Sequence, residues 1–350
     1  MLKFNIGNRY VGEDYPVFLV AELSANHLQK LDNAVKLIKA AKEAGADAVK
    51  LQTYTPDTIT IDCDNDYFKI NEGTLWDGKT LYELYKEAYT PWEWFPQLKR
   101  VAQEEDMILY STPFDKTAVD FLEKMDVPCY KVASFEITDI PLIEYMASKR
   151  KPVIISTGIA VLPDIEEAVN ACRKRGNDQI VLLKCTSAYP TPLEEVNLRT
   201  IPDLKEMFKT IVGLSDHTLG ISVPVASVAL GARTIEKHLT LSRSMGGPDA
   251  AFSLEPDEFK MMVKSVRETE KALGNISYEL TEEMKKSRKF ARSLFIVKDM
   301  KAGEVFTEEN VRSIRPGIGL HPKYFKDILG KKAAIDIKRG TPLQQELIMG

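Results

Sequence analysis

Short apolar runs recur along the first two thirds of the chain, and each is followed by a helical pattern or by a Gly/Pro turn signal. Eight of these runs predict buried strands, at residues 17–23, 47–53, 107–113, 129–134, 152–157, 180–186, 211–217 and 234–240. Amphipathic segments such as residues 31–46 and 162–176 lie between them and predict helices. Alternating strands and helices pair in parallel, so eight units predict an α/β fold, a (β/α)8 TIM barrel. The main alternative is a doubly wound open sheet, but no Gly-rich dinucleotide fingerprint follows the first strand.

Two intervals depart from this rhythm. Residues 54–90 follow the second predicted strand where a short loop would be enough, and a long excursion after a barrel strand usually builds a substrate lid or wall. Further on, a helix ending at Gly274 leads into a charged connector and then into short strands with Lys-Ala-Gly and Arg-Gly turns. We therefore predict a catalytic barrel at residues 1–275, a linker at 276–287 and a small β-rich domain at 288–350.

Composition and charge narrow the range of partners. The chain has 350 residues, of which 44% are hydrophobic and 28% charged, and its net charge of −4 predicts no basic surface for nucleic acid or an anionic membrane. Gly, Asp and Pro interrupt the N-terminal residues before a long apolar stretch develops, so we expect neither a signal peptide nor a membrane span, and a cytoplasmic location. The four cysteines have no CxxC spacing, which favours buried free thiols.

The last two predicted strands each carry a histidine near the carboxyl end. The chain has only four histidines, His27, His217, His238 and His321. Side chains two apart share a face of a strand, so Glu236 and His238 point the same way, as do Ser215 and His217. Neighbouring strands lie about 4.8 Å apart, so His217 and His238 are placed to bind one divalent ion, with Glu22 of the first strand beside them. Two imidazoles with oxygen donors suit Mn, Co or Zn better than Mg. The alternative is that each imidazole is an interior hydrogen-bonding group.

A second set of polar residues at predicted strand ends has the chemistry of an anion pocket, because buried lysines are costly unless they meet negative charge. The set consists of Lys50, Lys131, Ser134, Ser156, Ser187, Tyr189 and Ser215. Taken singly, each serine fits a turn or cap and each lysine fits a solvated face; their convergence favours phosphate. A Schiff-base aldolase using Lys131, Lys184 or Lys237 is the alternative, but Glu236 and the histidine pair favour a carbonyl polarised by a metal.

The order of motifs carries a resemblance over essentially the whole chain. The segments AELSANH, VKLQTY, STPFD, YKVASFE, STGIA, CTSAYPTP, GLSDHTLG, IEKHLTL, GGPDAAFSLEP and RPGIGL follow one another, and SDHTLG with EKH twenty residues later is a specific combination. This sequence resembles the sialic acid synthase (nonulosonic acid synthase) family, including a C-terminal antifreeze-like (SAF, β-clip) domain.

The resemblance implies a phosphoenolpyruvate-dependent condensation with an N-acylated amino sugar, which gives a nine-carbon acid and inorganic phosphate. By motif, it implies that His217 and His238 hold a divalent metal, Mn2+ foremost with Mg2+ or Co2+ as alternatives, and that Glu22 and Glu236 are the acid/base carboxylates. It implies that the seven residues of the anion set contact phosphoenolpyruvate and that Gln52 and Asp249 lie near the sugar. Arg315 resembles an arginine that enters the partner subunit's active site, which implies a domain-swapped homodimer.

Two positions depart from the pattern of N-acetylneuraminic acid enzymes, because Ala250 and Lys184 stand where those carry His. Together with the segment around Trp76 and Tyr85, this looks more like the pseudaminic acid synthase group. The implied substrate is 2,4-diacetamido-2,4,6-trideoxy-L-altrose, which is less polar at C6, and this predicts an apolar wall at a residue such as Ala251 or Phe252. Trp76, Tyr85 and Trp92 either contact the sugar or only pack the excursion.

Other functions are also compatible with the sequence. Within the same class these are an N-acetylneuraminate or legionaminate synthase and a spore-coat polysaccharide homologue. From a different class, an ice-binding or carbohydrate-binding module on an inactive barrel would have lost metal or phosphate residues, whereas each of those positions is occupied here. A metal-dependent hydrolase would usually need a richer His/Asp cluster.

Overall fold

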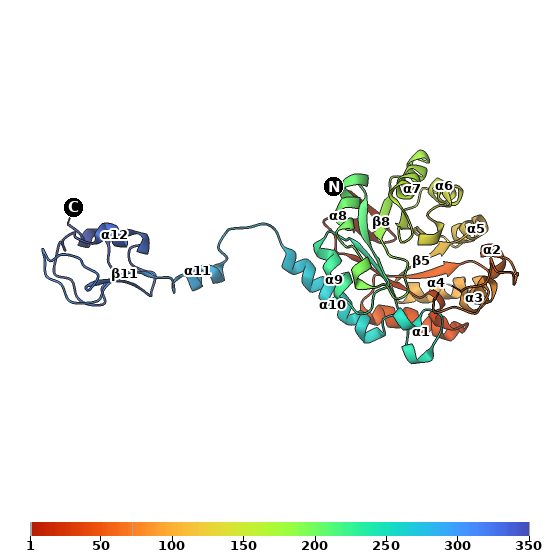
Figure 1. The fold of residues 1–350 in the computed structure, drawn as a ribbon, viewed down its shortest axis with the longest axis horizontal. Helices are drawn as coiled ribbons and strands as arrows, with labels where there is room; N and C mark the ends of the chain where they lie inside the picture. The colour runs from red at the N-terminus through yellow and green to blue at the C-terminus, as the bar shows by residue number, and fades with distance from the viewer. Residues whose placement is uncertain (1, 72, 350) are drawn as a thin grey trace. The chain divides into compact units, whose positions relative to one another are not determined.

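The computed structural model describes residues 2–71 and 73–349. The chain divides into two compact units, residues 1–274 and 275–350 (Figure 1). The first unit holds the barrel and the second the small C-terminal domain.

Eight parallel strands close into a barrel in the first unit, in the order β10-β3-β4-β5-β6-β7-β8-β9. They are β3 (Phe18–Glu22), β4 (Ala48–Thr53), β5 (Ile108–Pro113), β6 (Tyr130–Val132), β7 (Val153–Ser156), β8 (Ile180–Lys184), β9 (Ile211–Asp216) and β10 (Thr234–His238). Each lies within one of the eight predicted runs, so the predicted barrel is confirmed. The doubly wound alternative is wrong, because β10 pairs with β3 and leaves no open edge.

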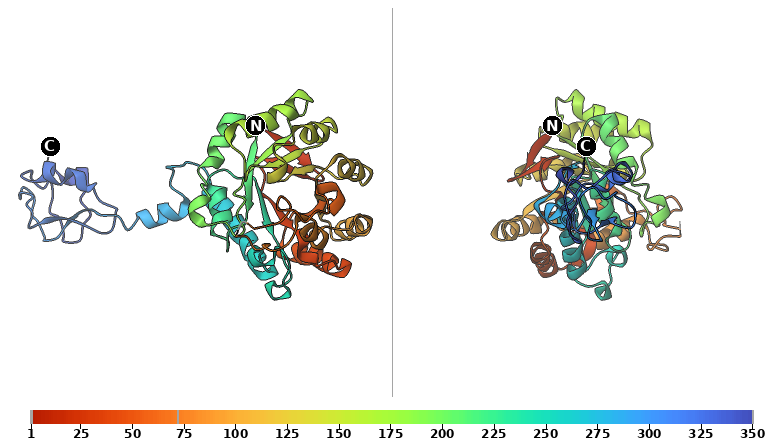
Figure 2. Two further views of the ribbon diagram at one scale, coloured as in Figure 1. Left: turned by 45° about the vertical axis from the view of Figure 1, so that its right-hand side comes forward. Right: turned by 90° about the vertical axis from the view of Figure 1, so that its left-hand side faces the viewer.

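Helices surround the strands (Figure 2). The principal ones are α1 (Leu31–Ala44), α4 (Phe95–Glu104), α5 (Lys116–Lys124), α6 (Ile140–Ser148), α7 (Leu162–Lys174), α8 (Thr200–Phe208), α9 (Ser222–Ala229) and α10 (Pro256–Leu273). Their apolar faces pack on the outside of the barrel; in α1 this face consists of Ala34, Leu37, Ile38 and Ala41. Gly45, at φ 89°, ends α1 in the left-handed conformation that glycine adopts without strain.

The barrel interior forms a separate core. Inward side chains such as Phe18, Val20, Tyr110 and Ile154 fill it, because alternate residues of each strand face the axis. Ile6 and Val11 join this core from a hairpin that the sequence pattern did not predict, β1 (Lys3–Ile6) with β2 (Arg9–Gly12). The hairpin therefore adds apolar side chains to the interior of the barrel and leaves its chemistry to the carboxyl ends of the strands.

The predicted excursion of residues 54–90 contains two helices, α2 (Pro56–Ile59) and α3 (Leu81–Ala88). A bridge between Lys69 and Thr80 precedes α3, and a capping box fixes its start, because Thr80 Oγ1 accepts from Glu83 N and Glu83 Oε2 accepts from Thr80 N. Glu72 of this excursion lies outside the described residues. The excursion is thus an ordered element of the barrel unit.

The second unit has its own small core, which includes Leu294, Ile296, Phe306, Val311 and Leu343. Its elements are α11 (Glu282–Arg288), β11 (Ser293–Ile296), β12 (Val311–Ile314) and α12 (Phe325–Ile328). The predicted bounds of the linker, 276–287, and of the C-terminal domain, 288–350, are not tested by these elements and stay predictions.

Three of the four cysteines are the buried free thiols that the sequence predicts. All four cysteines are free, and Cys129, Cys172 and Cys185 are buried, whereas Cys63 in the excursion is partly exposed. Among the described residues, none of the helices has the length and hydropathy required to span a bilayer.

Candidate active site

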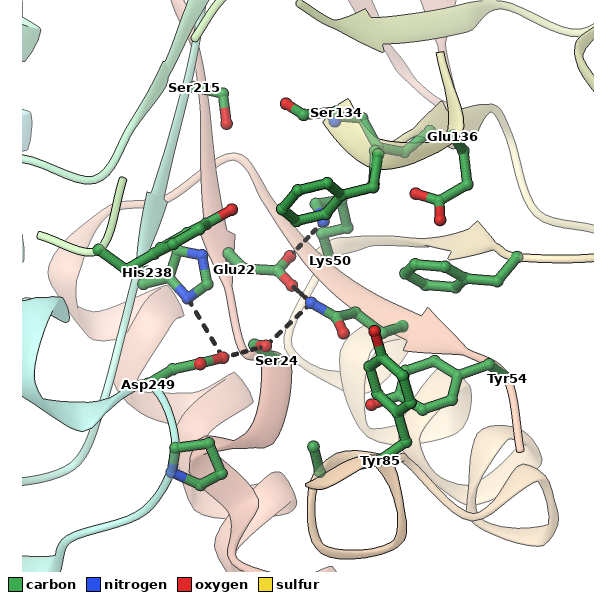
Figure 3. Close-up of a pocket in the computed structure, with 18 of the residues that line it drawn as sticks. Glu22, Ser24, Lys50, Tyr54, Tyr85, Ser134, Glu136, Ser215, His238 and Asp249 are labelled. Carbon is green, nitrogen blue, oxygen red and sulfur yellow. Dashed lines mark hydrogen bonds and ion pairs between the residues drawn. The ribbon is translucent and has the colours of Figure 1, made fainter. Parts of the chain in front are cut away.

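A cavity of about 320 Å³ lies at the carboxyl ends of the barrel strands (Figure 3). Eleven of the predicted site residues line it: Glu22, Lys50, Gln52, Lys131, Ser134, Tyr189, Ser215, His217, Glu236, His238 and Asp249. Ser156 and Ser187 stand behind this lining, and Arg315 is an exposed residue of the second unit. The structure therefore brings most of the predicted residues into one cavity.

A buried group of three charges forms the base of the cavity. Lys50 Nζ lies 2.6 Å from Glu22 Oε2 and 3.6 Å from Glu236 Oε1. Register explains the contact, because Glu22 on β3 pairs with Lys50 on β4 and β10 flanks β3 on its other side. Burial raises the pKa of Glu22, whereas Lys131 and Lys50 outweigh burial and lower the pKa of Glu236. Glu22 is thus the carboxylate that accepts a proton more readily.

The two histidines lie side by side, with ring centroids 5.3 Å apart. His217 Nδ1 lies 3.3 Å from the Thr186 carbonyl oxygen, and donation to that oxygen fixes the tautomer whose Nε2 has the free lone pair. His238 Nδ1 is buried without a hydrogen-bond partner, 3.8 Å from Asp249 Oδ2. Burial holds the pKa of His238 well below its usual range, so the ring is neutral.

This pair fits a divalent metal. Two imidazoles supply nitrogen donors, and the unpartnered Nδ1 of His238 is the group that a metal would satisfy. Within residues 2–71 and 73–349, no group of three or more His, Cys, Asp and Glu side chains is arranged to hold a metal. A metal held by the pair would keep its remaining positions open to water or substrate oxygens, as catalytic metals do.

Lysine and hydroxyl groups gather on another side of the cavity. Lys131 Nζ donates to Ser156 Oγ at 2.6 Å, and Gly158 N donates to Ser134 Oγ at 3.0 Å. Ser187 Oγ is buried and has no partner. A Cβ at Gly158 would lie only 2.2 Å from Ser187 Oγ and 2.6 Å from Ser134 Oγ, so this position requires glycine. The cluster has the hydrogen-bond donors of a small anion site, although Ser156 and Ser187 do not line the main cavity.

A polar chain connects the histidine side of the cavity to its centre. Gln52 Nε2 donates to Glu22 Oε1 at 3.0 Å and to Ser24 Oγ at 2.9 Å, and Ser24 Oγ donates to Asp249 Oδ2. Figure 3 shows Ser24 between Glu22 and Asp249, with a dashed line from Ser24 to Asp249. Sequence reasoning did not single out Ser24, although its place two residues after Glu22 at the end of β3 was a signal.

Glu136 is a second residue that sequence reasoning missed. It follows Ser134 in the short 3-10 helix after β6 and lines the cavity, and its Oε2 is buried without a partner. Burial raises its pKa to about 7. The signal was its position two residues beyond Ser134, in a segment that already carried the resemblance.

The three lysines of the Schiff-base alternative have different surroundings. Lys237 is fully buried on the outer side of the barrel, where its Nζ donates to Asp216 Oδ2 and to the Thr218 carbonyl oxygen. Lys184 Nζ donates to the Cys185 carbonyl oxygen and lies outside the main cavity. Only Lys131 of the three lines the cavity, and it faces the hydroxyl cluster described above.

The predicted apolar wall does not lie at Ala251 or Phe252. Ala251 is exposed and lines another cavity, and Phe252 is buried against the rings of His217 and His238. Trp76 lines the main cavity, packs on Tyr189 and donates from Nε1 to the Pro248 carbonyl oxygen, so the excursion reaches the loop after β10. Trp92 instead donates to the Tyr54 carbonyl oxygen and stacks on Phe121, which is a packing role.

Fold and cavity together define a class, that of (β/α)8-barrel enzymes with the site at the carboxyl ends of the strands. The chain belongs to the NeuB family, which matches residues 37–278, and residues 291–349 match the SAF domain. The resemblance drawn from the motifs is therefore confirmed. Enzymes of this family generally depend on a divalent metal.

Individual relatives match over nearly their full lengths. The chain is 51% identical to the pseudaminic acid synthase of Campylobacter jejuni subsp. jejuni serotype O:2, over 97% of this chain and 98% of that protein. It is 46% identical to the pseudaminic acid synthase of Helicobacter pylori, over 95% and 97%. The crystal structure of the spore coat polysaccharide biosynthesis protein spsE of Bacillus subtilis is similar with a TM-score of 0.68 at 36% identity, over 100% of this chain and 99% of that one.

Lys237→Met is expected to destabilise the barrel, because it leaves the buried Asp216 carboxylate without its ion pair. We expect a loss of about 3–5 kcal/mol in the free energy of unfolding, measured by denaturant titration. The double variant Asp216→Asn with Lys237→Met recovers at least half of that loss. Lys184→Met, at the end of β8, is the control because, within the described part of the chain, its Nζ has no carboxylate partner at hydrogen-bond distance and donates to the Cys185 carbonyl oxygen. A loss as large as that of Lys237→Met would contradict this prediction.

Glu136→Gln is expected to stabilise the protein at alkaline pH. The carboxyl of Glu136 titrates at about 7 in the fold and at 4.5 in a free side chain, so its stabilising effect is complete below pH 4.5 and is lost as the pH rises through 7. Allowing for partial exposure, the variant gains about 2 kcal/mol at pH 8 and almost nothing at pH 4.5. Thermal unfolding at the two pH values measures this, and a pH-independent difference would refute it.

Proposed function

We propose that this protein is a metal-dependent pseudaminic acid synthase, which condenses phosphoenolpyruvate with 2,4-diacetamido-2,4,6-trideoxy-L-altrose. The products are pseudaminic acid and phosphate, released by cleavage of the C–O bond. The observation that carries the proposal is a single cavity in which the histidine pair and the lysine-hydroxyl cluster meet at Lys50, Glu22 and Glu236. Relatives of that name, at 46–51% identity over nearly their full lengths, support the choice of sugar.

Phosphoenolpyruvate would bind through the anion set, with its phosphate at Lys131, Ser134, Ser156 and Ser187. Glycine at position 158 lets the hydroxyls of Ser134 and Ser187 approach the backbone closely, which keeps these groups together at the proposed phosphate site. The remaining members of the set, Lys50, Tyr189 and Ser215, would hold the carboxylate and the enol carbon over the centre of the cavity. Gln52 and Asp249 would hold the sugar.

His217 and His238 would hold the divalent metal, Mn2+ foremost, and the metal supplies polarisation of the sugar aldehyde. Attack of C3 of phosphoenolpyruvate on the aldehyde carbon leaves an alkoxide and a cationic C2. Glu22, whose pKa burial raises, donates a proton to the alkoxide. Glu236, held ionised by Lys131 and Lys50, stabilises C2 and takes a proton from the water that attacks it. Collapse of the adduct at C2 breaks the C–O bond to phosphate and forms the ketone, and the C2 hydroxyl proton leaves with the phosphate. Lys50 lies between Glu22, which gives a proton in these steps, and Glu236, which takes one.

The C-terminal domain would act on a second copy of the chain. Residues 1–275 form the catalytic domain in this proposal, 276–287 the linker and 288–350 the SAF domain, which presents Arg315 to the sugar site of the partner in a domain-swapped homodimer. The exposed position of Arg315 is compatible with such a contact. The cytoplasmic location expected from the N-terminal sequence belongs to the same proposal.

A substrate panel tests the reaction. With phosphoenolpyruvate and Mn2+, we expect phosphate release with the trideoxy-altrose substrate at least about tenfold faster, in kcat/KM, than with N-acetylmannosamine or the legionaminic acid precursor. His238→Ala should lose Mn2+ binding in a calorimetric titration together with turnover. Turnover confined to N-acetylmannosamine would reject the proposed sugar, and a His238→Ala variant that keeps both properties would reject the metal site.

Mixed dimers test the role of Arg315. Arg315→Ala and His238→Ala homodimers are both expected to be nearly inactive. Co-expression should restore about a quarter of the normal activity, because half of the dimers are mixed and each then has one complete site. An arginine that acted within its own subunit would restore none, so absence of recovery would reject the domain swap while leaving the reaction in place.

A further inference from the structure

The excursion after β4 makes one side of the cavity mostly apolar, whereas the other sides carry charged and polar groups. Ile59 of α2, Leu84, Tyr85 and Ala88 of α3, and Phe114 after β5 line it, and we call these five residues the apolar wall. Leu84 and Ala88 are four residues apart on α3 and therefore share a helix face. The aliphatic side chains of the wall offer neither a hydrogen-bond donor nor an acceptor to a ligand.

Aromatic packing holds this surface in place. The buried ring of Tyr54 makes edge contacts with Tyr85 at 5.5 Å and with Phe114 at 5.0 Å. Burial raises the pKa of Tyr54 well above its usual range, so its hydroxyl stays neutral. A wall anchored in this way keeps its shape without a ligand, which is what discrimination between similar substrates requires.

The wall lies opposite the histidine pair. Figure 3 shows His238 and Asp249 on one side of the cavity and Tyr54 and Tyr85 on the other, with Glu22 between them. An open-chain sugar whose aldehyde carbon faces the histidines extends past Glu22 toward the wall. The carbon most remote from the aldehyde is C6, so in that orientation C6 would lie toward the side of the cavity that Ile59, Leu84 and Ala88 line.

We propose that the apolar wall is the element that selects a C6-deoxy sugar, by packing Ile59, Leu84 and Ala88 against the C6 methyl group. This inference rests on the proposed function and adds to it the residues that read one end of the sugar. A C6 hydroxyl packed against Ile59, Leu84 and Ala88 loses its hydrogen bonds to water and gains none from these three side chains. The excursion, rather than Ala251 or Phe252, then supplies the apolar contact that the substrate needs.

The test compares Ile59→Thr and Ala88→Ser with the unaltered protein in the presence of saturating phosphoenolpyruvate and Mn2+. The substrates are the trideoxy sugar, its C6-hydroxylated analogue and an analogue with formyl in place of acetyl at N4. We expect the unaltered protein to prefer C6-deoxy over C6-hydroxyl by about 10- to 100-fold in kcat/KM, and Ile59→Thr to lower this ratio at least about fivefold. The KM for phosphoenolpyruvate should stay the same, since a general loss of structure would raise it.

Ile61→Thr is the matched control, because Ile61 is 58% exposed in the same segment and the substitution is the same. An Ile59→Thr variant with an unchanged C6 ratio would overturn the inference, as would a variant whose discrimination changes only between formyl and acetyl. An unaltered protein that turns over only N-acetylmannosamine would instead reject the proposed function, so the two failures are distinguishable.

Discussion

Lys50 between Glu22 and Glu236 is the interaction on which the rest of the site depends. Titratable groups removed from water are tolerated only when each has a partner at short range, and here the lysine serves both carboxyl groups. The barrel makes this possible because β10, β3 and β4 are neighbours with fixed register. The histidine pair, the hydroxyl cluster and the polar chain through Gln52 are all arranged around these charges, and the opposite pKa shifts of the two carboxylates follow from what surrounds each of them.

The alternation of side chains on strands explains why so much of the site could be predicted from the sequence. Glu236 and His238 face the cavity, whereas Lys237 between them is buried outside the barrel with Asp216. A local pattern of three titratable residues thus separates into two different environments. The eight strands could be predicted equally well, because each apolar run has the length of a buried strand and is followed by a helix or turn signal.

The parts that escaped prediction depend on contacts between distant segments. The hairpin that carries Ile6 and Val11 was not predicted, and only the packing of these residues against the barrel interior gives them a role. The pKa of the Glu136 carboxyl is raised because the group is buried, and the residues beside it in the sequence do not predict that burial. An apolar wall was expected at Ala251 or Phe252, whereas apolar residues of α2 and α3 line the cavity, because the path of a long excursion is set by tertiary packing and not by local periodicity.

The excursion joins the barrel between β4 and α4, and the groups that surround the condensation chemistry lie on other elements. Most of the wall that would read the far end of the sugar belongs to this one continuous segment, whereas Gly158 and the charged centre leave almost no freedom for change. Substitutions in the excursion can therefore occur without substitutions in the charged centre. If the wall reads the sugar as proposed, substitutions in this insertion would change the sugar preference while the charged centre of the cavity keeps its residues.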